Sequence, residues 1–336
     1  MPLAAAGKAG GWARSQETSP LAHRPKPSRE GVVAVSWRFA QLLTVVLAVL
    51  SPPACSRAPA AAAIVRVDDW GRTVALPAPA RRIVSLAPAT TELVFALGLG
   101  DRLVGRTRWC DYPPAAQRVA DVGDGMGPNV EAVAARKPDL VLVYASPANR
   151  AAADRLAALG IPVVALALDR AADLRRAAVL IGGLAGATRA ADSLVEAFDA
   201  LRTEVAHEAE RRRGPRPKVY VDVWADPPMT VGRGSYLQEE VEAAGGDNIF
   251  DDVRASSATV SLEAIARRDP DVIVVLQSDT SRIPDLAARP GWTAVRAVRE
   301  GRILVLDGAL FGRPSPRMPL AARDLGARLA RLAAAP

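Results

Sequence analysis

The sequence contains little cysteine and histidine, and this scarcity excludes several kinds of site. Its 336 residues include two cysteines and two histidines, which are too few for a disulfide framework and lack the spacing of a metal site. His23 lies in a polar N-terminal segment and His207 in a charged helical pattern, so a Ser/His/Asp triad has at most one candidate base. No G-x-x-x-x-G-K-[ST] phosphate loop occurs. We therefore expect no catalytic residues, no metal site and no resident cofactor.

A strong charge of one sign is lacking as well. The chain has 43 Lys and Arg against 36 Asp and Glu, a net charge of +7. Residues 1–55 hold six of the basic and two of the acidic residues, which leaves 37 against 34 in the rest. A body so near charge balance does not have the basic surface that nucleic acid requires, so we expect no nucleic-acid partner. Half of the residues are hydrophobic, and the length predicts about two globular units.

No apolar stretch is long enough to cross a bilayer. The twelve residues from Phe39 to Leu50 form an apolar run, whereas a membrane-spanning helix needs about 20. Arg38 precedes this run and small residues follow it, which is typical of an export signal. Cys55 stands where a lipidated cysteine would stand, and ordinary cleavage further on, after Ala60, is the alternative. Both interpretations place the protein in the periplasm or at the cell surface.

The remaining sequence contains an internal repeat. Asn129 to Val143 (NVEAVAARKPDLVLV) and Ser261 to Val275 (SLEAIARRDPDVIVV) share seven of fifteen residues at a spacing of 132. Such self-similarity indicates two related lobes. In each copy the pattern predicts a short helix that begins at Glu131 or Glu263 and leads into an unbroken apolar strand. Strands that are apolar throughout suit a parallel sheet covered on both faces.

The order of strands and helices predicts an α/β fold with two Rossmann-like lobes, each built on a parallel sheet. The first lobe shows strands at 82–86, 103–107, 140–144 and 161–166, with helices such as 90–97 and 151–159. The second shows strands at 218–223, 272–276 and 302–306, with helices at 236–244, 262–268 and 320–332.

One long helix is predicted to join the lobes, because residues 189–213 contain no Gly or Pro and carry apolar residues at helical spacing. A helical connection opposes wide hinge opening. The predicted division is a leader with signal peptide at 1–55, a linker with a short hairpin at 56–80, the first lobe at 81–187, the linking helix at 188–214 and the second lobe at 215–336.

Aromatic residues are scarce, so their positions are informative. Twelve follow Ala63, and four of these stand at or just after the ends of predicted strands: Trp109, Tyr144, Trp224 and Phe311. Parallel sheets bind ligands at the carboxyl ends of their strands, so these residues predict a cleft between the lobes. Anchoring of loops to the protein surface is the alternative interpretation.

Several polar residues lie near these aromatic positions in the sequence. Arginines at a cleft bind carboxylates or phosphates of a ligand. In a chain this rich in arginine, a solvated surface position is the alternative for each of them. The candidates are Arg106, Arg108, Arg233 and Arg313, together with Tyr236.

Six motifs, in order and spacing, resemble the class III solute-binding proteins of ABC importers, and most closely the cobalamin-binding type. The resemblance runs from about Arg81 to the C-terminus, and Ile64 to Pro77 resembles a short hairpin that precedes the first lobe in many members. The motifs are Ile83 to Leu93 (IVSLAPATTEL), Asp111 to Pro114 (DYPP), Asn129 to Glu131 (NVE), Lys137 to Leu140 (KPDL), Gly245 to Phe250 (GGDNIF) and Ser315 to Arg317 (SPR).

The resemblance implies that a monomer binds a large iron or cobalt chelate between two lobes and performs no chemistry on it. It also implies that one exposed glutamate on each lobe, here Glu131 and Glu263, docks on arginines of an inner-membrane permease that works with an ATPase. A carboxylate at a helix N-terminus is stabilised by the helix dipole, so simple helix capping is the alternative for both residues.

The resemblance is incomplete at two loops. Cobalamin binders carry tryptophans shortly before each docking glutamate, whereas residues 123–127 and 255–258 contain none. A corrinoid is the leading hypothesis for the ligand, and a ferric siderophore or haem is the alternative, with Tyr112, Tyr144 or Tyr236 as an iron ligand. More distant alternatives are a structural envelope protein and an exported α/β enzyme that uses carboxylates such as Glu92, Asp111 and Asp226.

Overall fold

A computed structural model describes residues 62–334 of the chain. The predicted export signal and Cys55 lie outside these residues. Within the described range, no helix is both long enough and apolar enough to cross a membrane.

Two four-stranded parallel sheets form the frame of the molecule, as the sequence predicts. The first has the strand order β4-β3-β5-β6 and the second the order β10-β7-β12-β13. The first sheet consists of β3 (Ile83–Ser85), β4 (Leu103–Arg106), β5 (Leu140–Tyr144) and β6 (Val163–Leu166). The second consists of β7 (Lys218–Asp222), β10 (Asp247–Asn248), β12 (Val272–Gln277) and β13 (Ile303–Asp307).

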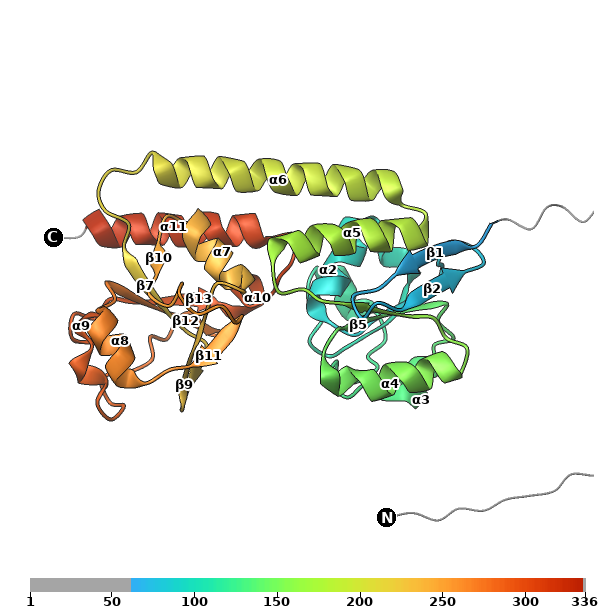
Figure 1. Cartoon of the computed structure of the whole chain (residues 1–336), viewed down its shortest axis with the longest axis horizontal. Helices are drawn as coiled ribbons and strands as arrows, with labels where there is room; N and C mark the ends of the chain where they lie inside the picture. Colours follow the sequence, from blue (N-terminus) through green and yellow to red (C-terminus); the bar gives the residue numbers. More distant parts are fainter. Residues whose placement is uncertain (1–61, 335–336) are drawn as a thin grey trace, which may run out of the picture. The chain divides into compact units, whose positions relative to one another are not determined.

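Helices cover both faces of each sheet (Figure 1). In the first lobe α2 (Pro88–Ala96) and α5 (Ala171–Ala185) lie on one face, and α3 (Val130–Ala134) and α4 (Pro147–Ala158) on the other. In the second lobe α7 (Tyr236–Ala243), α10 (Gly308–Phe311) and α11 (Met318–Ala334) pack opposite α8 (Leu262–Arg268) and α9 (Arg296–Arg299). Short 3-10 helices lie at Gly100–Arg102, Pro114–Arg118 and Trp292–Ala294.

The apolar strands divide their side chains between two hydrophobic cores in each lobe. Leu140 and Leu142 of β5 point into the core under α2 and α5, and Val141 and Val143 into the core under α3 and α4. Strand β12 does the same in the second lobe. Successive side chains of a strand point to opposite faces, which is why both repeated strands are apolar at every position.

The long helix α6 (Thr188–Glu210) connects the lobes, as predicted. It packs against α5 of the first lobe and against α7 and α11 of the second. A glycine allows the close contact with α5, because a Cβ atom on Gly182 would come within 2.6 Å of the Cβ atom of Ala191. Ion pairs with distances of 2.9 Å for Arg175 to Asp199 and 2.8 Å for Arg323 to Glu204 extend the contact to both lobes.

Three features of the fold were not predicted from the sequence. Helix α5 is absent from the predicted elements, since Gly182 and Gly183 interrupt its pattern near the end. Gly182 allows close packing against α6, and Gly183 leaves room for the Arg66 side chain. The strand β10 is also absent from the predicted elements, because its two residues are too few to form a pattern. The third feature is a small antiparallel sheet in the order β11-β9-β8, formed by β8 (Trp224–Ala225), β9 (Pro228–Val231) and β11 (Ser257–Thr259).

A β-hairpin precedes the first lobe, in agreement with the resemblance. Its strands β1 (Ile64–Val67) and β2 (Thr73–Leu76) pair antiparallel. The turn covers the edge of β6, because the Asp69 amide donates to the Ala165 carbonyl oxygen (3.0 Å) and the Ala165 amide donates to Asp68 Oδ2 (3.1 Å). An edge strand whose backbone groups are paired in this way offers little to another chain.

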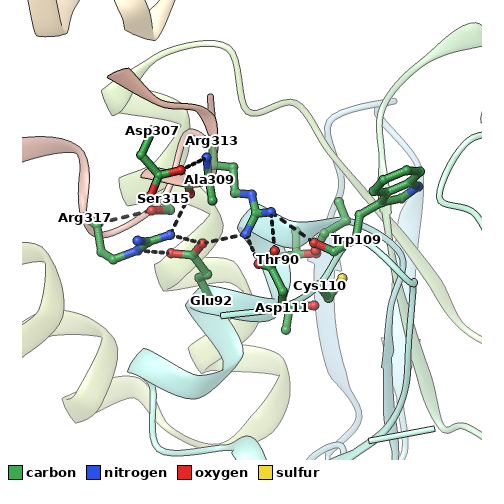
Figure 2. A network of polar contacts seen from close by, with 12 residues as sticks. Thr90, Glu92, Trp109, Cys110, Asp111, Asp307, Ala309, Arg313, Ser315 and Arg317 are labelled. Carbon is green, nitrogen blue, oxygen red and sulfur yellow. Dashed lines mark hydrogen bonds and ion pairs between the residues drawn. The ribbon is translucent and has the colours of Figure 1, made fainter. Parts of the chain in front are cut away.

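A buried ion pair joins the lobes directly (Figure 2). Arg317, just before α11, donates from Nε to Glu92 Oε2 (2.8 Å) and from Nη2 to Glu92 Oε1 (2.7 Å). Glu92 on α2 is 2% exposed. The same Nη2 also donates to the Ala309 carbonyl oxygen at 2.9 Å. A bidentate arginine that also donates to a backbone carbonyl oxygen is a geometry in which a buried carboxylate is tolerated.

We predict that Glu92→Gln lowers the free energy of unfolding by about 3 kcal/mol, because it leaves the Arg317 charge buried without its partner. Urea denaturation measures this change. The matched control is Asp324→Asn, which removes a more exposed ion pair with Arg328 within α11 at 2.9 Å. The control is expected to cost less than about 0.5 kcal/mol, and equal losses in the two variants would contradict the role given to Glu92.

Candidate functional site

A cavity of about 360 Å³ lies between the two lobes. Its lining follows the carboxyl ends of β3, β4, β5 and β6 in the first lobe and of β13 in the second. The edges of the two sheets thus meet where parallel sheets bind ligands. The lining residues are Ala87, Pro88, Ala89, Trp109, Tyr144, Leu168 and Asp169 of the first lobe, and Tyr236, Gly312, Arg313 and Pro314 of the second.

Two tyrosines meet at an aspartate where the lobes join in this cavity. The Tyr144 hydroxyl donates to Asp169 Oδ1 at 2.9 Å, and the backbone amide of Tyr236 donates to the Asp169 carbonyl oxygen at 2.6 Å. Burial, together with the hydrogen bond to Asp169, raises the pKa of Tyr144 to about 12. Burial also raises the pKa of Tyr236. Both phenols are therefore uncharged near neutral pH, and Tyr236 packs against the cores of both lobes.

Arg313 connects the second lobe to the loop that follows β4. Its guanidinium binds the Asp111 carboxylate, with 3.1 Å from Nη2 to Oδ2, and donates to the Trp109 carbonyl oxygen at 3.2 Å (Figure 2). The hydrogen bond from Arg313 holds the pKa of Asp111 below its usual range. A distance of 3.7 Å from Nη1 to Glu92 Oε1 joins this contact to the ion pair between the lobes. Arg313 thereby fixes the loop that carries Trp109.

The two predicted tryptophans are both exposed. Trp109 is 60% exposed and its Nε1 donates to Asp124 Oδ1 at 2.9 Å. Trp224 on β8 is 63% exposed and its Nε1 donates to the Asp226 carbonyl oxygen at 3.0 Å. Trp109 lines the cavity, whereas Trp224 does not. These hydrogen bonds occupy the polar edge of each ring, so the faces stay available for stacking.

The predicted arginines differ in where they lie. Arg313 lines the cavity, whereas Arg108 is exposed and pairs with Asp124 at 3.1 Å. Arg106 is occupied by backbone carbonyl oxygens, including that of Thr107 at 2.9 Å from Nη1. Arg233 does not line the cavity, and its Nε donates to the Asp251 carbonyl oxygen at 2.9 Å. A ligand contact at Arg233 remains a prediction.

The prediction that Phe311 contacts a ligand is wrong. Phe311 is 1% exposed and belongs to the core of the second lobe. Helix α10 begins directly after β13 and directs this ring inward. Its position after a strand therefore serves packing. Leu168 and Asp169 also line the cavity but were not predicted to do so. They follow the carboxyl end of β6, so the position of ligand sites in parallel sheets could have identified them.

Glu131 and Glu263 occupy equivalent positions on the two lobes. Each is the second residue of its helix, because α3 begins at Val130 and α8 at Leu262. Their side chains are 76% and 87% exposed. The caps of these helices are the side chains of Asn129 and Ser261, which accept from backbone amides at 2.9 and 3.1 Å. Capping is thus accomplished without the glutamates. Glu131 accepts from Arg155 Nη2 at 2.9 Å and Glu263 lies 3.9 Å from Arg267 Nη1, and both glutamate side chains stay largely exposed beside these arginines.

Two of the three carboxylates named for an enzyme hypothesis form ion pairs. Glu92 is paired with Arg317 and Asp111 with Arg313. Among residues 62–334, no group of three or more His, Cys, Asp and Glu side chains is arranged to hold a metal ion. Cys110 is buried, with its Sγ 3.1 Å from Thr107 Oγ1.

Comparison with known proteins shows the family. Residues 83–310 match the family described as periplasmic binding protein, and the chain belongs to this family of substrate-binding proteins. The family places the protein in the periplasm.

Similar proteins include binders of vitamin B12 and of haem. The vitamin B12-binding protein of Yersinia pestis (strain Pestoides F) is 34% identical over 278 residues, which is 81% of this chain and 93% of the relative. The crystal structure of the periplasmic vitamin B12 binding protein BtuF of Vibrio cholerae has a TM-score of 0.63 and 23% identity, covering 76% of this chain and 98% of the other. A periplasmic heme binding protein from Pseudomonas aeruginosa has a TM-score of 0.65 and 25% identity, covering 75% and 93%.

Proposed function

We propose that this protein is the substrate-binding component of an ABC importer, and that it captures a corrinoid between its lobes and delivers it to a membrane permease. The observation that carries the proposal is the cavity between the lobes, in a chain 34% identical to a vitamin B12-binding protein. The strand ends of both lobes meet there, so a ligand touches both at once.

The size and chemistry of the cavity suit partial enclosure of a large ligand. A cavity of about 360 Å³ is near the lower end of small-molecule pockets, so a corrinoid would extend beyond it toward the exposed ring of Trp109. Uncharged phenols, prolines and leucine provide apolar contact, and Arg313 supplies one cationic group. Stacking and apolar burial hold a macrocycle without any change in its bonds.

The connection between the lobes favours capture with little domain motion. Helix α6 packs on both lobes, and the Glu92 to Arg317 pair links them beside the cavity. Wide opening would expose this buried ion pair and separate Tyr236 from the core of the first lobe. We therefore infer that release to the permease requires a force applied by the partner, with a small change in lobe orientation.

Haem is a second candidate ligand because Tyr144 presents a phenol to the cavity and a heme binding protein is among the similar structures. Iron coordination by Tyr144 would need loss of its proton, and the raised pKa of about 12 opposes this loss. A ferric siderophore, held partly by Arg313, is the further alternative in this family. We favour the corrinoid on these grounds.

We predict that the protein binds cyanocobalamin or cobinamide in titration calorimetry, with little heat from a ferric hydroxamate siderophore. Trp109→Ala should weaken corrinoid binding by about tenfold, because an exposed ring is lost from the cavity wall. The control is Trp70→Ala, whose ring lies between Arg72 and Arg150 on the hairpin side of the first lobe. Binding of the siderophore alone would refute the corrinoid assignment, and a Soret shift with added haem would favour haem.

We propose that Glu131 and Glu263 dock on the permease. The double variant Glu131→Ala with Glu263→Ala should bind the ligand with unchanged affinity and abolish its import, because both carboxylates lie outside the cavity. Uptake of labelled cobalamin by cells that depend on this protein measures the effect. Glu196→Ala, at an exposed position on α6, is the control and should import normally. Normal import by the double variant would refute the docking role.

We further propose that residues 39–50 direct export and that Cys55 is lipidated. Both features lie outside the described residues, and their support is the sequence pattern alone. Mass spectrometry of the N-terminal peptide of the exported protein tests this proposal. An unmodified terminus beyond Cys55 would refute lipidation.

A further inference from the structure

The loop of residues 123–127 lies across the carboxyl ends of the first-lobe strands. A Cβ atom on Gly125 would come within 2.1 Å of the carbonyl oxygen of Leu86, which directly follows β3. The Gly127 amide donates to Asn149 Oδ1 at 3.1 Å, and Asn149 in turn donates to the Tyr144 carbonyl oxygen at the end of β5, also at 3.1 Å. The absence of a side chain at Gly125 allows this close approach. The loop is therefore fixed on the same sheet edge as the cavity.

Met126 is the apolar side chain that this loop presents. It is 58% exposed, whereas Met318 is 2% exposed and Met229 is partly buried. Its sulfur lies 3.9 Å from Asn149 Nδ2 and 4.0 Å from Ser146 Oγ. Trp109 is tied to the same loop through Asp124. Two large apolar groups, each more than half exposed, thus stand on one loop system at the ligand edge of the lobe.

The exposed Met126 side chain stands on a loop whose backbone position is fixed. Its loop is held by hydrogen bonds to the buried Asn149, so the side chain is presented from a fixed base. The cavity alone is small for a macrocycle. The exposed side chains of Trp109 and Met126 add apolar surface on the loops that are tied to the same sheet edge. A thioether adapts its shape to a ligand face more readily than a ring.

We propose that Met126 contacts the ligand beside Trp109 and that oxidation of its sulfur weakens ligand binding. This inference rests on the function proposed above. Methionine oxidation turns a flexible apolar side chain into a polar one, so the contact loses its apolar character. The donors Ser146 and Asn149 already face the sulfur and would hold the new oxygen in place.

The oxidation step with hydrogen peroxide is a two-electron oxygen transfer. A lone pair on Met126 Sδ attacks one peroxide oxygen, the S–O bond forms and the O–O bond breaks. The hydroxide that leaves takes the proton of the transferred oxygen and becomes water. Sulfur is oxidised to the sulfoxide and peroxide is reduced. Reaction should reach Met126 before Met229 and Met318, because Met126 is the most exposed of the three methionines in the described range.

The test measures cyanocobalamin affinity of the full chain before and after treatment with hydrogen peroxide, with peptide mass spectrometry to follow each methionine. We expect affinity to fall by about five- to tenfold as Met126 sulfoxide accumulates. Met126→Leu should have the same affinity before and after peroxide treatment, since leucine keeps an apolar side chain without sulfur. Met126→Gln should bind as weakly as the oxidised protein, and Met229→Leu, the matched control, should remain sensitive.

Three results would overturn the inference. Unchanged affinity in protein whose Met126 is fully oxidised would show that the side chain does not contact the ligand. Loss of affinity in peroxide-treated Met126→Leu would place the sensitive group elsewhere. If the untreated protein binds neither cyanocobalamin, cobinamide nor haem, the proposed function and this inference are both overturned. If it binds cyanocobalamin and peroxide treatment leaves the affinity unchanged, only the inference is overturned.

Discussion

The buried pairing of Glu92 with Arg317 is the constraint on which the geometry between the lobes depends. A carboxylate that is 2% exposed requires a cationic partner at short range, and that partner comes from the other lobe, 225 residues away in the sequence. Arg313 lies beside it and extends the contact to Asp111 and the Trp109 backbone. The lobe orientation, the cavity and the position of Trp109 are therefore coupled through a few charged hydrogen bonds, as Figure 2 shows.

This coupling suits a protein that captures and releases a ligand without altering it. The ionic groups between the lobes are occupied by one another, and the phenols that meet at Asp169 are uncharged, so apolar contact is left as the main means of holding a macrocycle. The exposed side chains of Glu131 and Glu263 lie on helices α3 and α8, where they contact Arg155 at 2.9 Å and Arg267 at 3.9 Å. In our proposal the ligand binds in the cavity between the lobes, whereas the permease docks on the helices that carry these glutamates.

Much of the fold follows from the sequence, because burial on both faces leaves strands such as β5 and β12 apolar at every position. The internal repeat likewise predicts the equivalent sites of Glu131 and Glu263. The sequence does not reveal which residue after a strand turns inward, so Phe311 was assigned to the ligand when it belongs to the core. Contacts between distant segments, such as Glu92 with Arg317 or Gly125 with Leu86, leave no periodic pattern and need the structure.

The central claim is that a corrinoid binds between the lobes while the Glu92 to Arg317 pair remains closed. A crystal structure of the protein with cyanocobalamin tests it most directly. Our account predicts the corrin ring in contact with Trp109 and with the residues around Arg313, and the ion pair intact at the distances seen without ligand. A corrinoid bound outside this cavity, or lobes separated with Glu92 exposed to solvent, would contradict it.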